Sequence, residues 1–230
     1  FAPSFVTFGF AGHDAKMYVI ALLPFHFYFL ERGFQSRSLR PVLMLGGVTG
    51  LSILSSHTQM AYFALWGVGL YFLYRLHFLA REPGVQGSGA EGAHPRRDAA
   101  KVAGFFAVAL VAALAVGAVQ LLPAYVYVKN YSVRGTAAKT SFAHATEFSL
   151  HPEEIASLVV PEFVGYTTRE ADTYWGRNPF KLNSEYAGIL PLVFGALALA
   201  LRRDRRVWFF LGGGILALLY ALTYHTPLFR

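Results

Sequence analysis

The sequence predicts an all-α polytopic membrane protein, and three features of the chain predict this fold class. Of its 230 residues, 55% are hydrophobic and only 14% are charged, whereas soluble domains carry about 25% charged residues. The mean hydropathy is +0.41. The apolar residues form runs close to the about 20 positions that a membrane-crossing helix needs. Together with the absence of cysteine, these features exclude an ordinary cytosolic domain, a disordered tail and a disulfide-linked secreted module.

Six apolar runs are predicted to be transmembrane helices. They cover residues 17–30, 41–55, 58–80, 102–128, 186–201 and 207–224. The first contains Pro24 and is expected to begin a turn earlier, near Gly12, and residues 1–10 are a candidate for the end of a seventh helix. One bent helix over residues 41–80 would reach about 60 Å, about twice the hydrocarbon core, so two helices with a tight turn at His57 are favoured.

The positive charges orient these helices. Twelve of the 20 Lys and Arg residues fall in three connections, at residues 31–40, 75–101 and 202–206, which share one side of the membrane if the helices alternate. Because cytoplasmic loops carry an excess of Lys and Arg, we expect loops 31–40, 81–101 and 202–206 in the cytoplasm, with 81–101 a flexible linker. The net charge of +7 then describes orientation, and nucleic acid is not expected as a partner.

The opposite, extracytoplasmic face is predicted to collect most of the acidic residues and histidines. Its acidic residues, eight of the thirteen in the chain, are Asp14, Glu147, Glu153, Glu154, Glu162, Glu170, Asp172 and Glu185. Its histidines, five of eight, are His13, His57, His144, His151 and His225. Carboxylates and imidazoles supply acid–base chemistry and bind cations, so we expect the chemistry of the protein on this face.

The chain is expected to fall into three parts. Residues 1–128 hold transmembrane helices, residues 129–185 form an extracytoplasmic loop, and residues 186–230 hold two more helices. The chain begins with Phe1 rather than Met, shows no signal-peptide pattern and ends just after an apolar run. We therefore interpret it as an interior part of a longer protein.

A short amphipathic helix is predicted over residues 150–160 of the extracytoplasmic loop, where it would lie at the outer surface of the membrane. Pro152 suits the first helical position, Glu153 and Glu154 favour the positive end of the helix dipole, and Pro161 ends the helix. Its predicted apolar face is formed by Ile155, Leu158 and Val159. Two roles for the glutamates stay open: both stabilise the helix start, or one of them serves in a site.

The aromatic segment after this helix is a candidate substrate-binding segment. Tyr174 and Trp175 can stack on a sugar ring, and Arg177 can hold a phosphate through two hydrogen bonds. The alternative is an interfacial aromatic belt in which the arginine extends its charged end to water.

His13 and Asp14 stand immediately before the first complete predicted span and are candidate catalytic residues. Asp14 can act as a general base or bind a divalent cation through oxygen, with further ligands such as Glu147 or His57. A helix-capping role for Asp14 and a structural hydrogen-bonded role for His57 are the alternatives. His26 lies inside an apolar span, where an ionisable group contacts another helix, lines a cavity, or binds a pigment magnesium or haem iron.

Four strings of the sequence together resemble the bacterial YfhO-like membrane proteins. They are GHDAKMYVIALLPFHFYFLERG (12–33), SSHTQMAYFALW (55–66), ATEFSLHPEEIASLVVPEFVGY (145–166) and YWGRNPFKLNSEYAGILPL (174–192). That family is similar to the GT-C class of glycosyltransferases, many-helix membrane enzymes that take a sugar from a polyprenyl-phosphate carrier on the outer face. The resemblance implies a base or cation-binding role for Asp14 and carrier-phosphate contacts for Lys16, Arg134 and Arg177.

The sequence thus predicts part of a GT-C-like glycosyltransferase of the bacterial cytoplasmic membrane, with membrane lipids and a lipid-linked sugar donor as partners. Asp14 and His13 are the predicted catalytic residues, and Asp14 is the candidate ligand of a divalent cation. The predicted substrate-binding residues are Lys16, His57, Arg134, Glu147, Tyr174, Trp175 and Arg177. The alternative is a non-catalytic membrane subunit that contacts other membrane subunits in a larger complex, such as a pigment-binding or bioenergetic one.

Overall fold

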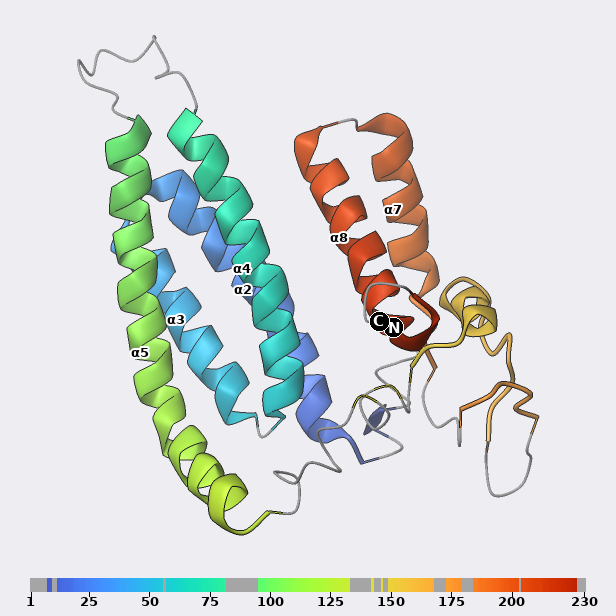
Figure 1. Cartoon of the computed structure of the whole chain (residues 1–230). Coiled ribbons are helices and arrows are strands. Elements are labelled where there is room, and N and C mark those ends of the chain that lie inside the picture. Colours follow the sequence, from blue (N-terminus) through green and yellow to red (C-terminus); the bar gives the residue numbers. More distant parts are fainter. Residues whose placement is uncertain are drawn as a thin grey trace. The chain divides into compact units, whose positions relative to one another are not determined.

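The computed structural model is all-α over the residues that it describes, as the sequence predicts (Figure 1). The described residues are 8–9, 12–55, 57–81, 95–132, 142, 146, 149–167, 173–178, 184–202 and 204–226. The chain divides into two compact units, one formed by Ala15–Tyr131 and the other by Phe1–Asp14 with Ser132–Arg230. Each unit is described by itself below.

The Ala15–Tyr131 unit is built from four long helices, which confirm the first four predicted apolar runs as helices. They are α2 (Asp14–Ser36), α3 (Leu39–Leu54), α4 (Thr58–Arg81) and α5 (Pro95–Asn130). The polar segment around His57 does separate α3 from α4. The predicted linker over 81–101 is partly wrong, because Pro95 starts α5 and residues 95–101 are helical, while residues 82–94 lie outside the described part.

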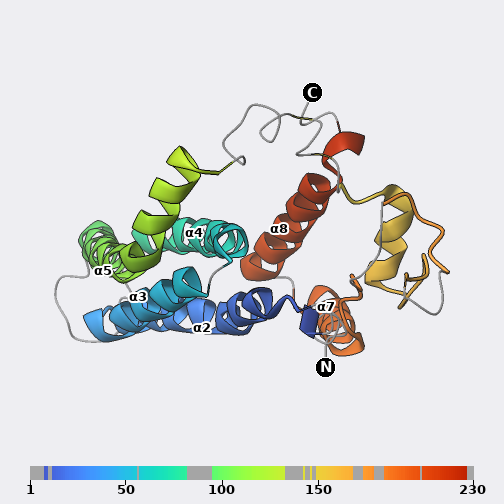
Figure 2. The same ribbon diagram turned by 90° about the horizontal axis from the view of Figure 1, so that it is seen from below.

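Helices α3 and α5 pack at close range through glycine and alanine (Figure 2). A Cβ atom added to Gly46 would lie 2.8 Å from the backbone oxygen of Ala109, and one added to Gly50 would lie 3.0 Å from Val116. Gly46 and Gly50 are one helical turn apart, so they form a small-residue face on which the second helix packs. From the other helix, Gly117 accommodates Ile53 in the same way.

An aromatic cluster joins α2, α4 and α5 in the same unit. The rings of Phe34, Phe72 and Phe106 lie with centroids 4.5 to 5.8 Å apart. The guanidinium carbon of Arg75 lies 5.4 Å from the centroid of the Phe34 ring, within the range of a cation–π contact. Arg75 also forms an ion pair with Glu31 of α2, with 3.0 Å between Nε and a carboxylate oxygen.

Glu31 shows that α2 runs further than predicted. The expected cytoplasmic loop at 31–40 begins only after Ser36, so Glu31 lies within the last third of the helix, where its carboxylate accepts a hydrogen bond from Tyr71 at 3.1 Å. The Glu31–Arg75 pair was missed by the sequence analysis because both residues are typical of helix ends near a membrane surface.

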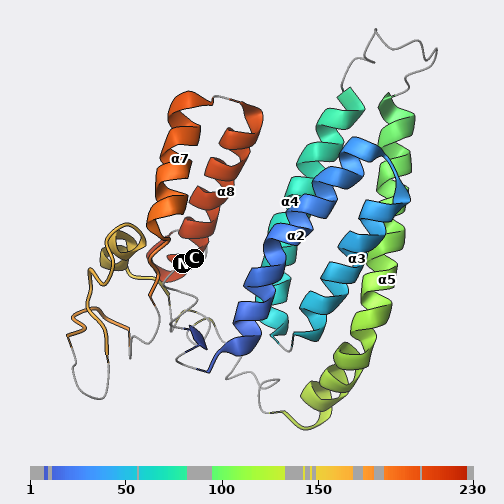
Figure 3. The ribbon, with the colours of Figure 1, turned by 180° about the vertical axis from the view of Figure 1, so that it is seen from behind.

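The other unit contains a 3₁₀ helix, η2 (Pro152–Leu158), two α-helices, α7 (Ile189–Leu201) and α8 (Arg205–Ala221), and a last 3₁₀ turn, η3 (Thr223–His225). The fifth and sixth predicted runs are therefore helical, although α7 begins three residues later than expected. Figure 3 shows α7 and α8 in this unit. Asp204 caps α8 by accepting hydrogen bonds from the backbone N–H groups of Arg206 and Val207.

The count of membrane spans differs from the prediction. In the described part of the chain, two helices are long and apolar enough to cross a membrane by length and composition, Thr58–Arg81 and Arg96–Asn130, and not six. Helices α3, α7 and α8 have 16, 13 and 17 residues, fewer than the about 20 that a hydrocarbon core requires. Helix α2 has 23 residues but carries charged side chains at both ends, including Asp14 and Glu31.

The α3–α5 contact predicts a difference between two neighbouring glycines. Gly46→Ala places a methyl group against the Ala109 backbone and should destabilise the protein by about 1–3 kcal/mol, because a backbone atom cannot move aside as a side chain can. Gly47→Ala is the matched control, since Gly47 has open space and alanine favours the helix by about 1 kcal/mol. Thermal unfolding of the purified chain in detergent measures both; equal melting temperatures would contradict the packing.

Candidate functional site

The candidate site is formed by η2 and the segment 173–178, which the chain brings back against it. Backbone N–H groups of Thr173 and Trp175 donate to the carbonyls of Tyr166 and Val164, each at 3.1 Å. Gly165 makes this return possible: its φ is +74°, and any Cβ there would overlap the carbonyl of Thr173. The two stretches therefore lie side by side although nothing in their periodicity links them.

Glu154 is the centre of the site. Its side chain is completely buried, and one carboxylate oxygen accepts a hydrogen bond from the Tyr174 hydroxyl at 2.8 Å. The other oxygen accepts from the side-chain amide of Asn178 at 2.7 Å and from the backbone N–H of His151 at 3.3 Å. The Tyr174 hydroxyl in turn accepts from the backbone N–H of Asn178 at 2.9 Å. Burial and the bond to Glu154 raise the pKa of Tyr174 to about 12.

Glu153, the preceding residue, holds Arg177. Two parallel hydrogen bonds of 2.6 and 2.7 Å join the guanidinium Nε and Nη2 to the two carboxylate oxygens. The bond to Arg177 lowers the pKa of Glu153 to about 2, and the same bond raises the pKa of Arg177. A guanidinium has five N–H donors, and this pair uses two of them. More than half of the Arg177 side chain stays exposed.

The helix that carries both glutamates differs from the prediction. It is a 3₁₀ helix of seven residues, Pro152–Leu158, and not an α-helix over 150–160, and it ends three residues before Pro161. It buries Glu154 and Ser157, while Val159 of the predicted apolar face follows the helix and is exposed. Three residues per turn place positions 154 and 157 on one side, so the buried face is polar.

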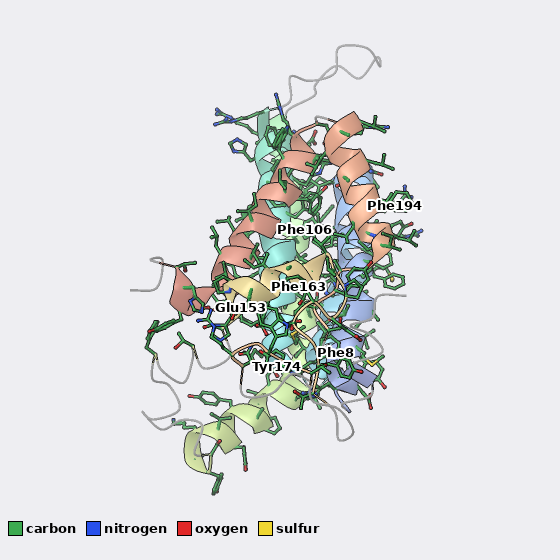
Figure 4. The ribbon with its side chains drawn as sticks, turned by 90° about the vertical axis from the view of Figure 1, so that its right-hand side faces the viewer. Phe8, Phe106, Glu153, Phe163, Tyr174 and Phe194 are labelled. Atoms are coloured by element: carbon green, nitrogen blue, oxygen red, sulfur yellow. The ribbon has the colours of Figure 1, made fainter. Side chains whose placement is uncertain are left out.

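Trp175 provides an aromatic surface beside these charges. Its indole N–H donates to the backbone carbonyl of Phe163 at 3.2 Å, and the two rings meet edge to face with centroids 5.9 Å apart. This bond fixes the orientation of the indole, yet the residue remains 57% exposed and Phe163 45% exposed. Figure 4 shows Glu153, Phe163 and Tyr174 in one region of this unit.

Two histidines, His151 and His225, contact each other at the start of η2. The Nδ1 atom of His151 lies 2.9 Å from the Nε2 atom of His225, which ends η3. Next to this pair, the backbone N–H of Leu150 donates to the carbonyl of Ala221 at 2.9 Å, so two segments far apart in sequence are joined twice. Burial lowers the pKa of His151, with the charges of Arg177 and His225 acting in the same direction.

The residues predicted for catalysis occupy the start of α2. Asp14 is exposed in the first helical turn, and the backbone N–H of His13 donates to the carbonyl of Phe8 at 2.8 Å. A first-turn aspartate favours the helix dipole. Within the described residues no group of three or more His, Cys, Asp or Glu side chains is placed to hold a metal ion.

The other predicted residues are not gathered at one place. His57 accepts a hydrogen bond from the backbone N–H of Met60 at 3.2 Å, which supports a structural role at the start of α4. Lys16 is half-buried on α2, and Arg134 and Glu147 lie outside the described residues. The buried His26 donates from Nδ1 to the backbone carbonyl of Leu22 at 2.9 Å.

Three members of the site were missed by the sequence analysis. They are Asn178, His225 as a partner of His151, and the carbonyl of Phe163. The sequence signals for them are weak: Asn178 lies within the aromatic segment, and His151 and His225 were expected on the same face.

Comparison with known proteins adds no family or fold assignment. No family model, no curated protein sequence and no solved structure matches this chain. The likeness to the YfhO-like proteins therefore remains an expectation based on the four strings of sequence.

The Tyr174 hydroxyl is predicted to be a stabilising group. Tyr174→Phe removes a donor to the Glu154 carboxylate and an acceptor for the Asn178 backbone, which should lower the free energy of unfolding by about 1–3 kcal/mol. Tyr166→Phe is the control, because Tyr166 is exposed in the same loop. Equal stability of the two variants in denaturant unfolding would show that the Tyr174 bonds contribute nothing.

The Glu153–Arg177 pair predicts an acid-sensitive segment. Because the folded pKa of Glu153 is about 2 against an ordinary 4.5, the pair stabilises fully above about pH 4.5 and loses this effect as the pH falls towards 2. The chain has three Trp residues, so replacing Trp66 and Trp208 by Phe leaves Trp175 as the sole fluorescent reporter. Fluorescence-detected unfolding of this background should show coupling between Glu153→Gln and Arg177→Gln at pH 7 that disappears at low pH. Coupling that is independent of pH would contradict the assignment.

Proposed function

We propose that this chain is part of a GT-C-like membrane glycosyltransferase that takes a sugar from a polyprenyl-phosphate donor on the extracytoplasmic face. The observation that carries the proposal is the fixed, exposed indole of Trp175 two residues from the exposed guanidinium of Arg177. An indole face binds the apolar face of a sugar ring, and a guanidinium binds the phosphate attached to it. Two residues of chain keep their Cα atoms within about 7 Å, a span suited to one sugar phosphate.

The contacts of the two glutamates support this arrangement. Glu153 aligns the Arg177 guanidinium without using all its donors, so N–H groups remain for phosphate oxygens. Glu154 fixes Tyr174 and Asn178 on either side of Trp175 and Arg177. A site whose side chains are held in place before the ligand arrives loses less entropy on binding. Tyr174 then acts as a positioning residue, since its hydroxyl is engaged within the protein.

The exposed apolar surface of α7 and α8 supports a membrane location with more spans than α4 and α5. Helices α7 and α8 bury none of their residues in the described structure, and their exposed side chains include Phe194 at 65% and Leu201 at 76%. Apolar surface of this extent marks contact with lipid or another protein. In the proposed arrangement, shorter helices such as α3 and α7 also cross or enter the membrane. Loops rich in Arg and Lys then face the cytoplasm of a bacterium.

Asp14 is the proposed base or cation ligand, with His13 beside it. Its exposure at the beginning of α2 leaves the carboxylate accessible to a substrate hydroxyl. A divalent cation held there would take its remaining ligands from the substrate phosphate, from water, or from residues outside the described part.

The alternative function is a non-catalytic membrane subunit. The unburied faces of α7 and α8 favour it, because partner helices would cover them as well as lipid does. Co-purification of the full-length protein with stoichiometric membrane subunits or a pigment, together with absence of sugar transfer, would favour this alternative.

The substrate site is tested by sugar transfer from a polyprenyl-phosphate sugar in the full-length protein. Trp175→Ala should raise KM for the donor about fivefold with little change in kcat, since stacking is worth about 1 kcal/mol and is made equally in the ground and transition states. Trp175→Phe should keep most of the affinity. Trp208→Ala is the control, because Trp208 is 59% exposed on α8 outside the site. Equal KM values for all three variants would remove Trp175 from donor binding.

The role of Asp14 is tested in the same assay. Asp14→Asn should lower kcat by about 10²–10⁴-fold if the carboxylate acts as general base, with unchanged thermal stability. Unchanged turnover would remove Asp14 from the mechanism and leave it a helix-stabilising residue.

A further inference from the structure

We propose that His151 and His225 form a two-histidine site for a divalent transition-metal ion such as Zn²⁺ or Cu²⁺, on the unit that carries the outer loop. The proposal does not depend on the glycosyltransferase activity. It concerns a different edge of η2 from Trp175 and Arg177, and it rests on the facing nitrogens of two histidines 74 residues apart in the sequence.

The spacing of the two nitrogens is the first argument. Two ligand nitrogens bound to one metal at about 2.0–2.1 Å, with an angle of about 90–109° at the metal, lie about 2.9–3.4 Å apart. The Nδ1 atom of His151 and the Nε2 atom of His225 lie 2.9 Å apart. The ring planes are inclined by 60°, so the imidazoles are not stacked and both nitrogens can turn towards one point beside the line that joins them.

The backbone around the pair is the second argument. The Leu150 N–H bond to the Ala221 carbonyl and the His225 N–H bond to the Leu222 carbonyl, at 2.9 and 2.7 Å, fix the chain on each side. The His151 N–H is held by the Glu154 carboxylate. Both imidazoles are therefore held together by bonds of the protein itself, which reduces the entropy lost when an ion binds.

The charges around the pair are mixed. Arg177 and His225 disfavour positive charge at His151, while Glu153 and Glu154 favour it. Arg177 is itself held by two bonds to Glu153. The two facing nitrogens, rather than the surrounding charges, therefore favour an ion here, and neutral imidazole is the form that binds metal.

The ligand type selects the metal. Imidazole nitrogen suits Zn²⁺, Cu²⁺ and Ni²⁺, whereas Mg²⁺ and Ca²⁺ prefer oxygen. With two protein ligands the ion keeps coordination positions for water or for an anion from solution. Such a site binds exchangeable metal, unlike a closed four-ligand structural site.

The test measures Zn²⁺ and Cu²⁺ binding to the full chain, prepared without a histidine tag, in detergent at pH 7.5. His151→Asn and His225→Gln keep a side chain able to hydrogen-bond across the contact but remove a metal-binding nitrogen. Each should weaken binding of the ion at least about tenfold, while His77→Gln, on the exposed side of α4, should leave it unchanged.

Spectroscopy distinguishes direct ligation from an indirect effect on folding. The electron paramagnetic resonance spectrum of bound Cu²⁺ should show two coupled nitrogens in the wild-type chain and one in either variant. Binding should also weaken below about pH 6, because protons compete for the imidazoles. Absence of saturable binding, or wild-type affinity in either variant, would overturn the proposal and leave the pair a hydrogen bond only. Neither result depends on sugar transfer.

Discussion

The buried carboxylate of Glu154 is the constraint on which the rest of the candidate site depends. Removing a carboxylate from water costs several kcal/mol unless hydrogen bonds replace the lost solvent. Here Tyr174, Asn178 and the His151 backbone supply those bonds. A hydrogen bond to a charged acceptor contributes about 1.5–3 kcal/mol to stability. The need to satisfy this one group holds segment 173–178 against η2. The exposed groups that can meet a ligand are placed as a consequence.

Two adjacent glutamates acquire opposite roles because a 3₁₀ helix turns successive side chains by about 120°. Glu154 faces inward and is fully buried, whereas Glu153 faces the exposed Arg177. Glu154 holds the local structure together. Glu153 orients the Arg177 guanidinium, which stays exposed enough to contact a ligand. The sequence analysis stated a structural role and a site role as alternatives for this pair. The contacts assign the structural role to Glu154 and make Glu153 the partner of a proposed substrate-binding residue.

The Ala15–Tyr131 unit follows a different principle. Its helices carry few polar groups, so packing depends on how closely the backbones approach, and Gly46, Gly50 and Gly117 set that distance between α3 and α5. The Glu31–Arg75 pair, with Tyr71 as a further donor, is the polar contact between α2 and α4. Removing one partner of such a pair leaves a charge in poorly solvated surroundings. Close packing and paired charge together specify how these helices associate.

The sequence by itself determined the helices, because apolar runs bounded by polar segments and prolines act over a few neighbouring residues. It located α4 almost to the residue and separated it from α3 at His57. It overestimated the helices long enough to span a membrane, since hydropathy alone does not fix where a helix begins and ends. The tertiary structure alone decided that the buried face of η2 is polar, that Glu154 meets Asn178, and that His151 meets His225. Those contacts join residues 24 and 74 positions apart, and no local pattern in the sequence records which distant segments meet.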